Sequence, residues 1–288
     1  MPKSGERHIS SKVVHIVVLG LSAPFQMKLE RFSGSREEIA RKVAEALAGL
    51  YEEAQADAKP SRYSGGRKAA WAVLEKFSVQ GYAGTRNKLH GNVSRLSFYI
   101  RHGVLGLREV AETIRERFGK SYDAAKFWQE LGWRQFWRLI YGRLGNQIYE
   151  DLETAKVPLG KGLSEELPED IRQGRTGLVC MDETVRELVE TGYLHNHARM
   201  WFASFVIHFR KLSWKAGERF FYRHLLDGDP ASNALSWQWV ASTFSHRPYL
   251  FNRDNVQENG GKKWCERCEA KCPFAATYPE LERRLLFA

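Results

Sequence analysis

Hydrophobic and polar positions along this chain follow the period of an α-helix from Ser35 onward. Ser35 and Glu38 have the spacing of a capping box, and apolar residues then recur at helical intervals from Ile39 to Leu50. Before them, residues 13–21 are apolar and rich in β-branched side chains, which predicts a short strand or a buried segment. The pattern as a whole predicts an all-α protein.

One stretch, residues 151–175, interrupts the helical pattern. It mixes prolines and glycines with charges of both signs, which is typical of a surface connection. We expect two parts in the chain: an N-terminal appendage over residues 1–63, with the short strand and one amphipathic helix, and a helical domain over residues 64–288. A chain of 288 residues is long enough to bury a substantial core.

The chain is basic, with a formal net charge of +10 at pH 7 and a pI of about 9.4. An excess of lysine and arginine suits a polyanionic partner such as nucleic acid, although solubility alone explains it equally well. No apolar run is long enough to span a membrane, and the N-terminus lacks a signal-peptide pattern. We therefore expect a cytoplasmic monomer without a membrane partner.

A polar cluster precedes an aromatic run in the second half of the chain. Asn196, Arg199 and Met200 are three or four positions apart, so on a helix they share one face. Asp227 or Asp229, in an Asp-Gly-Asp turn, can neutralise Arg199 if the two segments fold together. These residues fit an ordinary ion pair of the core as well as a ligand site, and the ion pair is the simpler interpretation.

A second helical face combines charges with indoles. Glu130, Trp133, Arg134 and Trp137 recur at helical spacing within FWQELGWRQFWRLIY. A plain amphipathic helix would carry aliphatic residues there, so this face indicates a cavity wall or a site where nucleic-acid bases stack. Packing of the same rings into the core is the alternative.

Two serines, Ser94 and Ser97, open another helical segment. Hydroxyls and free backbone N–H groups at a helix start suit a phosphate. Serines also cap helices without any ligand, so this signal is weak by itself.

The four cysteines form a concentrated pattern. Cys265, Cys268 and Cys272 lie within eight residues, and Cys180 is remote from them in sequence. In a cytosolic chain this arrangement indicates metal binding rather than disulfides. Four thiolates suit Zn²⁺ or an iron–sulfur cluster, and a proline after the last cysteine is familiar in the latter. Free thiols are the remaining alternative.

Three motifs, TGYLHNHARMWFASF, WKAGERFF and DGD-x3-N-x3-WQWVAS, closely resemble the flavin-binding core of the DNA photolyase and cryptochrome family. The resemblance extends over residues 64–288 and implies an all-helical domain that holds FAD in a bent conformation. Family members usually begin with an α/β domain that binds an antenna pigment. The residues before position 64 are too few for such a domain, so we expect no antenna chromophore.

The resemblance assigns flavin contacts residue by residue. It implies a salt bridge between Arg199 and Asp227 and places Asn233 beside flavin N5. The SRLS motif at residues 94–97 resembles a TSRLS phosphate clamp, with Val93 in place of the usual threonine. The full implied set of FAD contacts is Tyr82, Ser94, Leu96, Ser97, Phe127, Arg134, Asn196, Arg199, Asp227, Asp229 and Asn233.

The resemblance also implies residues for the reaction. Glu130 is expected to hydrogen-bond the damaged pyrimidines and Trp133 to stack on them, with Met200 and Trp239 completing a lesion pocket. The first two members of a tryptophan chain that carries an electron to the flavin are Trp237 and Trp214. No tryptophan in residues 151–175 supplies a third member, so electron entry uses another aromatic residue or is slow.

The cysteine order, Cys180 followed by Cys265, Cys268 and Cys272, resembles that of the bacterial cryptochromes and photolyases that ligate a [4Fe–4S] cluster. Zinc is the alternative metal. The spacing between the last two cysteines is shorter than is usual in that branch. The branch is associated with (6-4) lesions and commonly has a histidine where this chain has Asn196.

The sequence therefore predicts a flavoprotein, a DNA photolyase, that uses light to split pyrimidine dimers in single- or double-stranded UV-damaged DNA by electron transfer from excited FADH⁻. Asn196, Met200 and the WQW motif favour cyclobutane dimers. One alternative is a (6-4) photolyase, in which His195 or His197 would donate a proton. Others are a blue-light photoreceptor and a flavin-bound DNA-binding protein without repair, although a pure sensor has no need of a lesion pocket.

Overall fold

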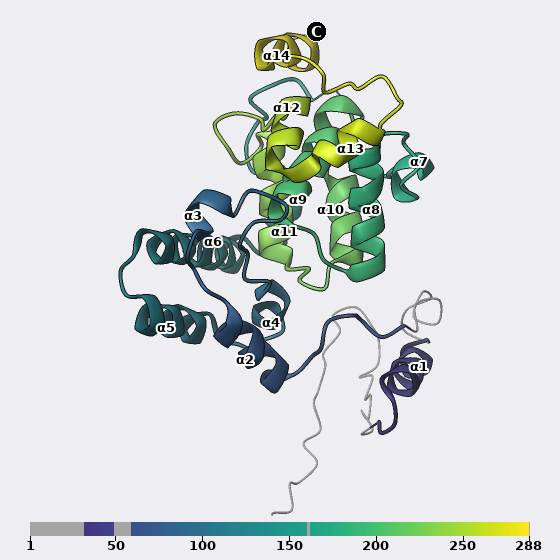
Figure 1. Ribbon diagram of the computed structural model, residues 1–288. Coiled ribbons are helices and arrows are strands. Elements are labelled where there is room, and N and C mark those ends of the chain that lie inside the picture. The colour runs from purple at the N-terminus through teal and green to yellow at the C-terminus, as the bar shows by residue number, and fades with distance from the viewer. Residues whose placement is uncertain (1–31, 49–58, 160–161, 288) are drawn as a thin grey trace, which may run out of the picture. The chain divides into compact units, whose positions relative to one another are not determined.

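The computed structural model describes residues 32–48, 59–159 and 162–287. The chain divides into two units, Met1–Ser61 and Arg62–Ala288 (Figure 1). The residues that the structure describes form helices and connecting turns without any strand, which confirms the predicted all-α class. The strand expected at residues 13–21 lies outside the described residues.

The first unit contains the helix α1 (Arg36–Leu47). Its capping box forms as predicted: the Glu38 backbone N–H donates to Ser35 Oγ at 3.2 Å, and the Ser35 N–H donates to Glu38 Oε2 at 2.8 Å. These two bonds satisfy donors that the first turn of a helix otherwise leaves free. The helix start could therefore be predicted from two residues.

The second unit is a set of helices of very different lengths. In chain order its helices are α2 (Arg67–Lys76), α3 (Tyr82–Thr85), α4 (Ser97–Arg101), α5 (Leu107–Phe118), α6 (Tyr122–Leu144), α7 (Glu169–Arg172), α8 (Val179–Thr191), α9 (Asn196–Ser204), α10 (Trp214–His224), α11 (Pro230–Ala241), α12 (Arg253–Val256), α13 (Lys262–Arg267) and α14 (Tyr278–Leu286). Three further helical turns are the 3₁₀ turn η2 (Gly145–Tyr149) and the π turns η3 (Phe205–Phe209) and η4 (Gln257–Gly261).

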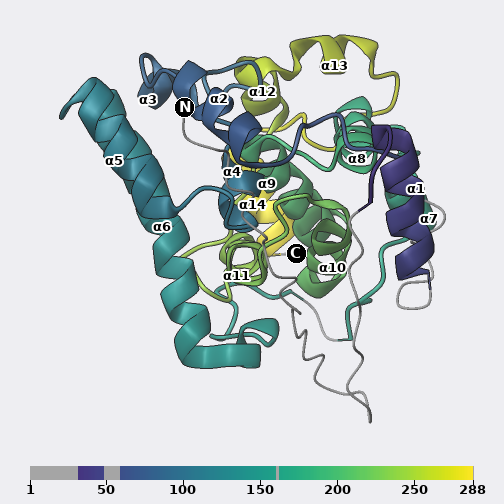
Figure 2. The ribbon, with the colours of Figure 1, turned by 90° about the horizontal axis from the view of Figure 1, so that it is seen from below.

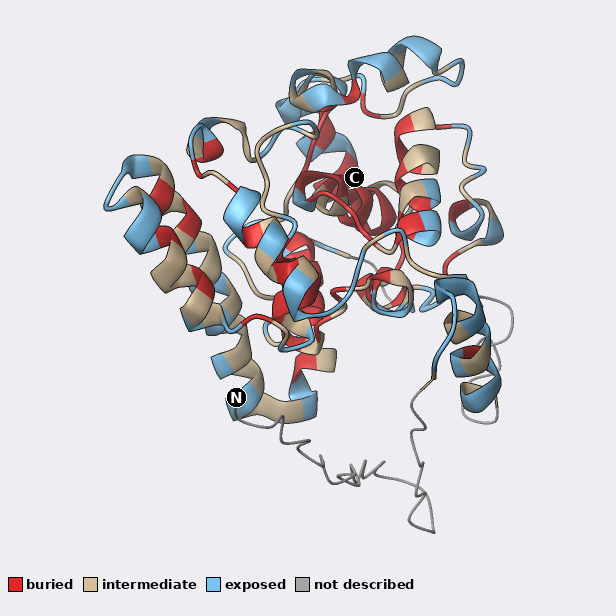
Figure 3. Cartoon of the chain, turned by 60° about the horizontal axis from the view of Figure 1, so that its bottom comes forward, coloured by how far each residue is buried: buried red, intermediate tan, exposed pale blue. Residues whose placement is uncertain are grey.

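The main core of this unit lies among α8, α9, α10 and α11, which stand side by side (Figure 1). Helix α9 is buried on nearly all sides, with Trp201 and Phe202 inaccessible to solvent, and Figure 3 shows the buried residues concentrated in these central helices. Each fully buried side chain of this size contributes about 1.5 to 3 kcal/mol to folding. A rigid centre thus carries the residues at positions 195–239.

A second core lies among α2, α4, α5 and the first half of α6. Helix α6 begins at Ser121, whose Oγ accepts the Ala124 backbone N–H at 3.3 Å. It is 23 residues long and runs along one side of the unit, where it contacts α5 and α11 (Figure 2). Helix α6 contributes residues to both cores and so joins them. The other face of its second half is partly exposed to solvent.

Residues 151–175 form more than the surface connection that their composition suggested. They include the short helix α7, and Ile171 within it is fully buried in the main core. Among the described residues, no helix is long and apolar enough to cross a membrane.

Candidate functional site

The ion pair expected between α9 and the Asp-Gly-Asp turn is present. Arg199 Nη2 donates to Asp227 Oδ1 at 3.0 Å and to Oδ2 at 2.9 Å, while Nε donates to the Leu194 carbonyl at 3.0 Å. Burial by itself would raise the pKa of the Asp227 carboxyl, but the charge and hydrogen bonds of Arg199 outweigh it and hold that pKa below its usual value. Asp227 is therefore an ionised acceptor that fixes the turn to α9.

The second aspartate of the turn gathers further arginines. Asp229 caps α11 by accepting the Ser232 N–H at 2.9 Å, and its Oδ2 lies 3.8 Å from Arg101 Nε and 3.9 Å from Arg138 Nε. Arg101 Nε also donates to the Gly228 carbonyl at 2.7 Å. Helices α4 and α6 are thus tied to the start of α11 by guanidinium groups.

Arg134 completes this group. Burial lowers the pKa of its guanidinium, and the charges of Asp229 and Asp227 raise it, so it lies near both carboxylates. Its Nε and Nη2 are buried and have no hydrogen-bond partner among the described residues, as is true of Ser232 Oγ. Ser97 Oγ is close to Asp227 but makes no well-formed hydrogen bond. Buried donors without acceptors are rare and costly, which points to a missing acceptor.

We call this group the arginine cluster: Arg101, Arg134, Arg138, Arg199, Asp227 and Asp229. Four guanidinium groups face two carboxylates, so the cluster has an excess of two positive charges. Arginine remains protonated in proteins, so this excess persists at neutral pH. The excess charge and the unpaired donors fit a dianionic group such as a pyrophosphate.

Other predicted FAD contacts lie in the second core or in the segment that leads to α4. Phe127 is 3% exposed and its ring centroid lies 5.3 Å from that of Tyr82, with Leu96 buried in the same core. Ser94 Oγ accepts the Leu96 N–H at 3.4 Å. In the structure Tyr82, Leu96 and Phe127 form part of the core between α2 and α6, Ser94 is half-buried, and the role of all four as flavin contacts stays a prediction.

The polar side chains on α9 and α11 have defined partners. Asn196 is exposed, and its Nδ2 lies 3.6 Å from Met200 Sδ, which agrees with one shared helix face. Asn233 is buried and its Nδ2 donates to Glu218 twice, to the backbone carbonyl at 2.9 Å and to Oε1 at 2.8 Å. Burial raises the pKa of Glu218, partly offset by this hydrogen bond. Asn233 is thus held by α10 with its amide nitrogen engaged.

The exposed face of α6 carries the residues predicted to contact a lesion. Glu130 forms ion pairs with Lys126 Nζ at 3.1 Å and with Arg86 Nη2 at 3.5 Å. Trp133 is 47% exposed and stacks on Trp137 with ring centroids 5.7 Å apart. A half-exposed indole beside a carboxylate is unusual on a helix surface, and the pair suits the recognition of a base.

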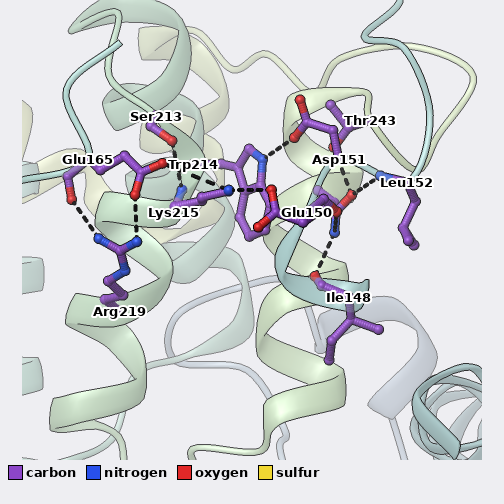
Figure 4. Close-up of polar contacts among 11 residues, drawn as sticks. Ile148, Glu150, Asp151, Leu152, Glu165, Ser213, Trp214, Lys215, Arg219 and Thr243 are labelled. Carbon is purple, nitrogen blue, oxygen red and sulfur yellow. Dashed lines mark hydrogen bonds and ion pairs between the residues drawn. The ribbon is translucent and has the colours of Figure 1, made fainter. Parts of the chain in front are cut away.

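The two tryptophans of the predicted electron chain are both buried. Trp237 packs against the backbone of Gly217, where an added Cβ would lie 2.0 Å from Trp237 Cη2. Gly217 is three residues after Trp214 on α10, so both residues face the same side of that helix. The indole of Trp237, from α11, therefore packs on the side of α10 from which Trp214 projects. Figure 4 shows Trp214 with its indole N–H directed at Asp151.

The four cysteines line one cavity of about 300 Å³, together with Arg253 and Lys271, and we call it the cysteine cavity. Burial, followed by the proximity of the other three sulfurs, raises the pKa of the Cys180 thiol. No three metal-binding side chains in the described ranges are already in ligand geometry. The structure thus brings the predicted ligands to one place, and the metal itself stays a prediction.

Comparison with known proteins agrees with this geometry. Residues 127–280 match the family model described as the FAD binding domain of DNA photolyase, which is more than half of the chain. The chain belongs to this family and carries its FAD-binding domain. The arginine cluster, with its positive excess and unpaired donors, is where the residues of this chain fit FAD.

The curated relatives that the chain matches include photo-lyases of several bacteria. The chain is 38% identical over 180 residues to a deoxyribodipyrimidine photo-lyase of Thermus thermophilus, covering 61% of this chain and 42% of that protein. It is 35% identical over 178 residues to that of Alkalihalophilus pseudofirmus, covering 59% and 36%. The chain therefore spans about two fifths of the length of these curated relatives.

Solved structures confirm the fold. A bacterial class III photolyase from Agrobacterium tumefaciens superposes with a TM-score of 0.60 at 27% identity, covering 72% of this chain and 45% of that one. A cryptochrome from Synechocystis superposes with a TM-score of 0.61 at 24% identity, covering 70% and 45%. The second similarity shows the helical fold alone.

Arg101, Arg138 and Glu218 are among the residues of the site that escaped the sequence reasoning. Arg138 is four positions after Arg134 and so shares its face of α6, a spacing that could have revealed it. Glu218 lies within the GERFF segment that was already recognised. Arg101 had no local signal, because only the folded chain brings the end of α4 to Asp229.

Proposed function

We propose that this chain binds FAD at the arginine cluster and uses light to split pyrimidine dimers in UV-damaged DNA. The observation that carries the proposal is that one face of α6 holds both the buried Arg134 of the cluster and, within one turn before it, the partly exposed Glu130 and Trp133. The single helix α6 would then set the distance between the cofactor and the lesion. The relatives whose names are deoxyribodipyrimidine photo-lyase support the same activity.

The cluster would bind the negatively charged part of FAD. Arg134 Nε and Nη2, Ser97 Oγ and Ser232 Oγ are donors in need of acceptors, and Arg101 and Arg138 add positive charge. When bound and fully reduced, FAD supplies an electron to the lesion on excitation by light. Asn233, held by Glu218, is positioned to accompany the flavin ring.

The face of α6 would receive the damaged bases. Trp133 and Trp239, 47% and 39% exposed, offer indole surfaces on which a flipped-out dimer can stack. Glu130, held by its ion pairs with Lys126 and Arg86, offers carboxylate oxygens as acceptors for base N–H groups. The basic surplus of the chain would bind the phosphates of single- or double-stranded DNA without reading the sequence.

Among lesions, we propose cyclobutane dimers as the substrate. Asn196 and Met200 contact each other at the exposed start of α9, where a (6-4) enzyme is expected to have histidines. Burial lowers the pKa of the nearby His195 to about 4, so this histidine is neutral at pH 7 and a poor acid. Both observations favour the lesion that needs no proton donor.

We also propose that the cysteine cavity holds a [4Fe–4S] cluster, with Zn²⁺ as the alternative. Four thiols converge on one space, and the charges of Arg253 and Lys271 suit a thiolate-bound cluster with net negative charge. The ligands come from α8 and from the segment around α13, so the metal would join these segments. Its role is structural in this proposal.

A second candidate function is a light-sensing protein that photoreduces FAD without repairing DNA. The buried pair Trp237 and Trp214 favours it, because that pair leads away from the lesion face toward Asp151. Glu130 is required for activity if the protein repairs DNA and is not required if it only senses light.

The test uses the purified, anaerobically photoreduced protein and an oligothymidine that contains cyclobutane dimers. We expect recovery of thymine absorbance in the light, slowed about tenfold to a hundredfold by Glu130→Gln through loss of a charged hydrogen bond, with FAD still bound. Glu112→Gln, on the exposed face of α5, is the matched control and should leave the rate unchanged. No recovery despite full flavin reduction and DNA binding would contradict cyclobutane repair and move the test to (6-4) lesions and then to sensing.

A further inference from the structure

Trp214 combines a buried ring with a strong hydrogen bond to a solvent-exposed acid. The residue is 4% exposed, and its indole Nε1–H donates to Asp151 Oδ1 at 2.6 Å (Figure 4). Asp151 itself is exposed. A buried indole is usually satisfied by a backbone carbonyl or a neutral side chain, so an ionisable partner that reaches solvent is chemically distinctive.

The position of Asp151 is fixed on both sides. Gln238 Nε2 donates to the carbonyls of Ile148 at 2.8 Å and Glu150 at 3.0 Å, and its Oε1 accepts the Leu152 N–H at 3.0 Å. Gln238 is fully buried on α11. These three bonds hold the segment around Asp151 against α11, which keeps its carboxylate on the indole of Trp214.

The neighbouring carboxylates have other partners. Lys215 Nζ pairs with Glu150 Oε2 at 2.7 Å and lies 3.8 Å from Glu165 Oε1, and Arg219 Nη2 pairs with Glu165 Oε2 at 2.5 Å (Figure 4). Asp151 is thus the acid of this network that faces the indole. It is also the group through which the buried ring connects to solvent.

The order from the interior to the surface is Trp237, Trp214 and Asp151. Trp237 lies next to Gln238 in sequence, and its ring packs on Gly217, one turn from Trp214. The predicted electron chain lacks a third tryptophan, and in this order an acid, Asp151, follows the second one. A chain can end at its second indole if the positive charge left there is removed as a proton.

We propose that Asp151 is the proton acceptor for Trp214 and that this pair ends the electron-transfer chain. The inference rests on the proposed flavin photochemistry, in which bound FAD, when oxidised and excited by light, would supply the acceptor for an electron from Trp237. An electron then passes from the Trp214 indole to the oxidised Trp237 indole. The Trp214 N–H bond breaks, its proton forms an O–H bond on the Asp151 carboxylate, and a neutral indolyl radical remains.

The proton transfer would make the charge separation last. Removing one electron from an indole makes its N–H far more acidic, and a carboxylate at 2.6 Å is already in place to receive the proton. Return of the electron then requires return of the proton. Because Asp151 is exposed, it can release that proton to water, and a thiol reductant can later restore the Trp214 indole with one electron and one proton.

The experiment excites the FAD-loaded protein with a laser pulse and follows the absorbance of the indole radical, whose protonated and deprotonated forms have different spectra. We expect deprotonation in the wild type to slow in D₂O. Asp151→Asn, which keeps an acceptor but takes up no proton, should deprotonate about a hundredfold more slowly, the lower range for a positioned base. Glu150→Gln, which changes the adjacent carboxylate and its ion pair with Lys215, is the matched control and should behave as wild type.

Two results would overturn the inference: deprotonation of Asp151→Asn at the wild-type rate, or an unchanged radical signal in Trp214→Phe. The D₂O effect on the wild type tests the same step without any substitution, so an unstable variant does not block the test. Resonance Raman scattering from the resting indole gives a readout of the Asp151 hydrogen bond that needs no flavin. Repair with chemically reduced FAD does not pass through Trp214, so failure of repair and failure of this proton transfer are separate outcomes.

Discussion

The arginine cluster and the cysteine cavity lie in the same unit but differ in what holds their polar groups in place. In the cluster, Asp227 and Asp229 already lie between 2.9 and 3.9 Å from arginine nitrogens. In the cavity, Cys268 Sγ approaches the Gly177 carbonyl at 3.7 Å, and burial raises the pKa of Cys265 and Cys272. The first site is assembled by ion pairs within the protein, and the second consists of four cysteine side chains around an open space.

This difference shows which site depends on its ligand. A site whose two carboxylates are already bonded to arginines keeps its geometry when the ligand is absent, so ligand binding adds little order even though it neutralises the remaining positive charge. Cysteine binds a metal as a thiolate, and the cysteine cavity would have to close around its metal, so metal binding and local folding are coupled. We therefore expect the two sites to respond differently to loss of a single side chain.

The largest effect is expected for Cys268→Ser. Metal binding to thiolates contributes on the order of 10 kcal/mol to the folding of small metal domains, so losing one ligand should lower soluble yield, iron content and FAD content together. Iron analysis, flavin absorbance and thermal unfolding measure these changes. Lys271→Gln, which changes the same cavity without removing a thiol, is the control. A folded, flavin-replete Cys268→Ser protein without iron would show that the cavity keeps its structure unaided.

The next effect is expected for Asp227→Asn. It leaves Arg199 without its buried counter-charge, which costs about 3 to 5 kcal/mol, or about 10 °C in the melting temperature. Flavin content should fall while iron content is retained, because the cysteine cavity is unaffected. Calorimetry and metal analysis on the same sample separate the two. Wild-type stability and full flavin content in this variant would mean that the ion pair is dispensable.

A smaller effect is expected from acid, and it should come from the core rather than from either site. Burial lowers the pKa of His208 from 6.5 to about 4, and its Nε2–H donates to the Val240 carbonyl at 3.0 Å. As the pH falls below 6.5 the unfolded chain gains a proton at this position and the folded chain does not. The free energy of unfolding should therefore fall by about 2 kcal/mol between pH 7 and pH 5 for each such histidine.

Denaturant unfolding of His208→Gln at both pH values checks this prediction. The glutamine keeps an N–H donor but does not titrate, so the loss of stability should shrink by about 2 kcal/mol. His195, whose pKa burial also lowers to about 4, would account for part of what remains. An identical pH dependence in the variant and the wild type would rule out His208 as a source.

The smallest effect is expected for Glu112→Gln on α5. Its carboxylate accepts Arg108 Nε at 2.9 Å on an exposed helix surface. Such i,i+4 pairs contribute about 0.3 to 0.5 kcal/mol at most, and salt screens them. Thermal unfolding at low and high salt should show almost no difference from wild type. A larger loss would mean that surface charge contributes to this fold more than its burial suggests.

Much of the local structure could be predicted because it depends on residues that are close in sequence. The start of α1 followed from Ser35 and Glu38, and the shared face of Asn196 and Met200 followed from a spacing of four. The need of a buried guanidinium for a counter-charge predicted that Arg199 pairs with Asp227 or Asp229, and the family resemblance implied the partner that is observed, Asp227. In each case one local requirement, such as a helix cap or a counter-charge, could be met by only a few nearby residues.

The remaining contacts could not be predicted because they join segments that are distant in sequence. Arg101 reaches Asp229 only because α4 packs at the start of α11. Asp151 lies in a stretch whose composition indicated only a surface connection, yet it accepts the indole of Trp214. Composition and periodicity describe a segment's own surface, and they contain no information about which other segment will cover it.

The contacts from the end of α4 to the Asp-Gly-Asp turn, here called the turn clamp, also affect how the chain folds. Arg101 bonds the Gly228 carbonyl across 127 positions, and His102 Nε2 lies 2.8 Å from the Leu226 carbonyl across 124 positions. Contacts of such long range close late, because loop-closure entropy opposes them until the rest has condensed. A cofactor that binds across this clamp would then slow unfolding without accelerating folding. The lifetime of the loaded protein would therefore depend on when α4 releases the turn.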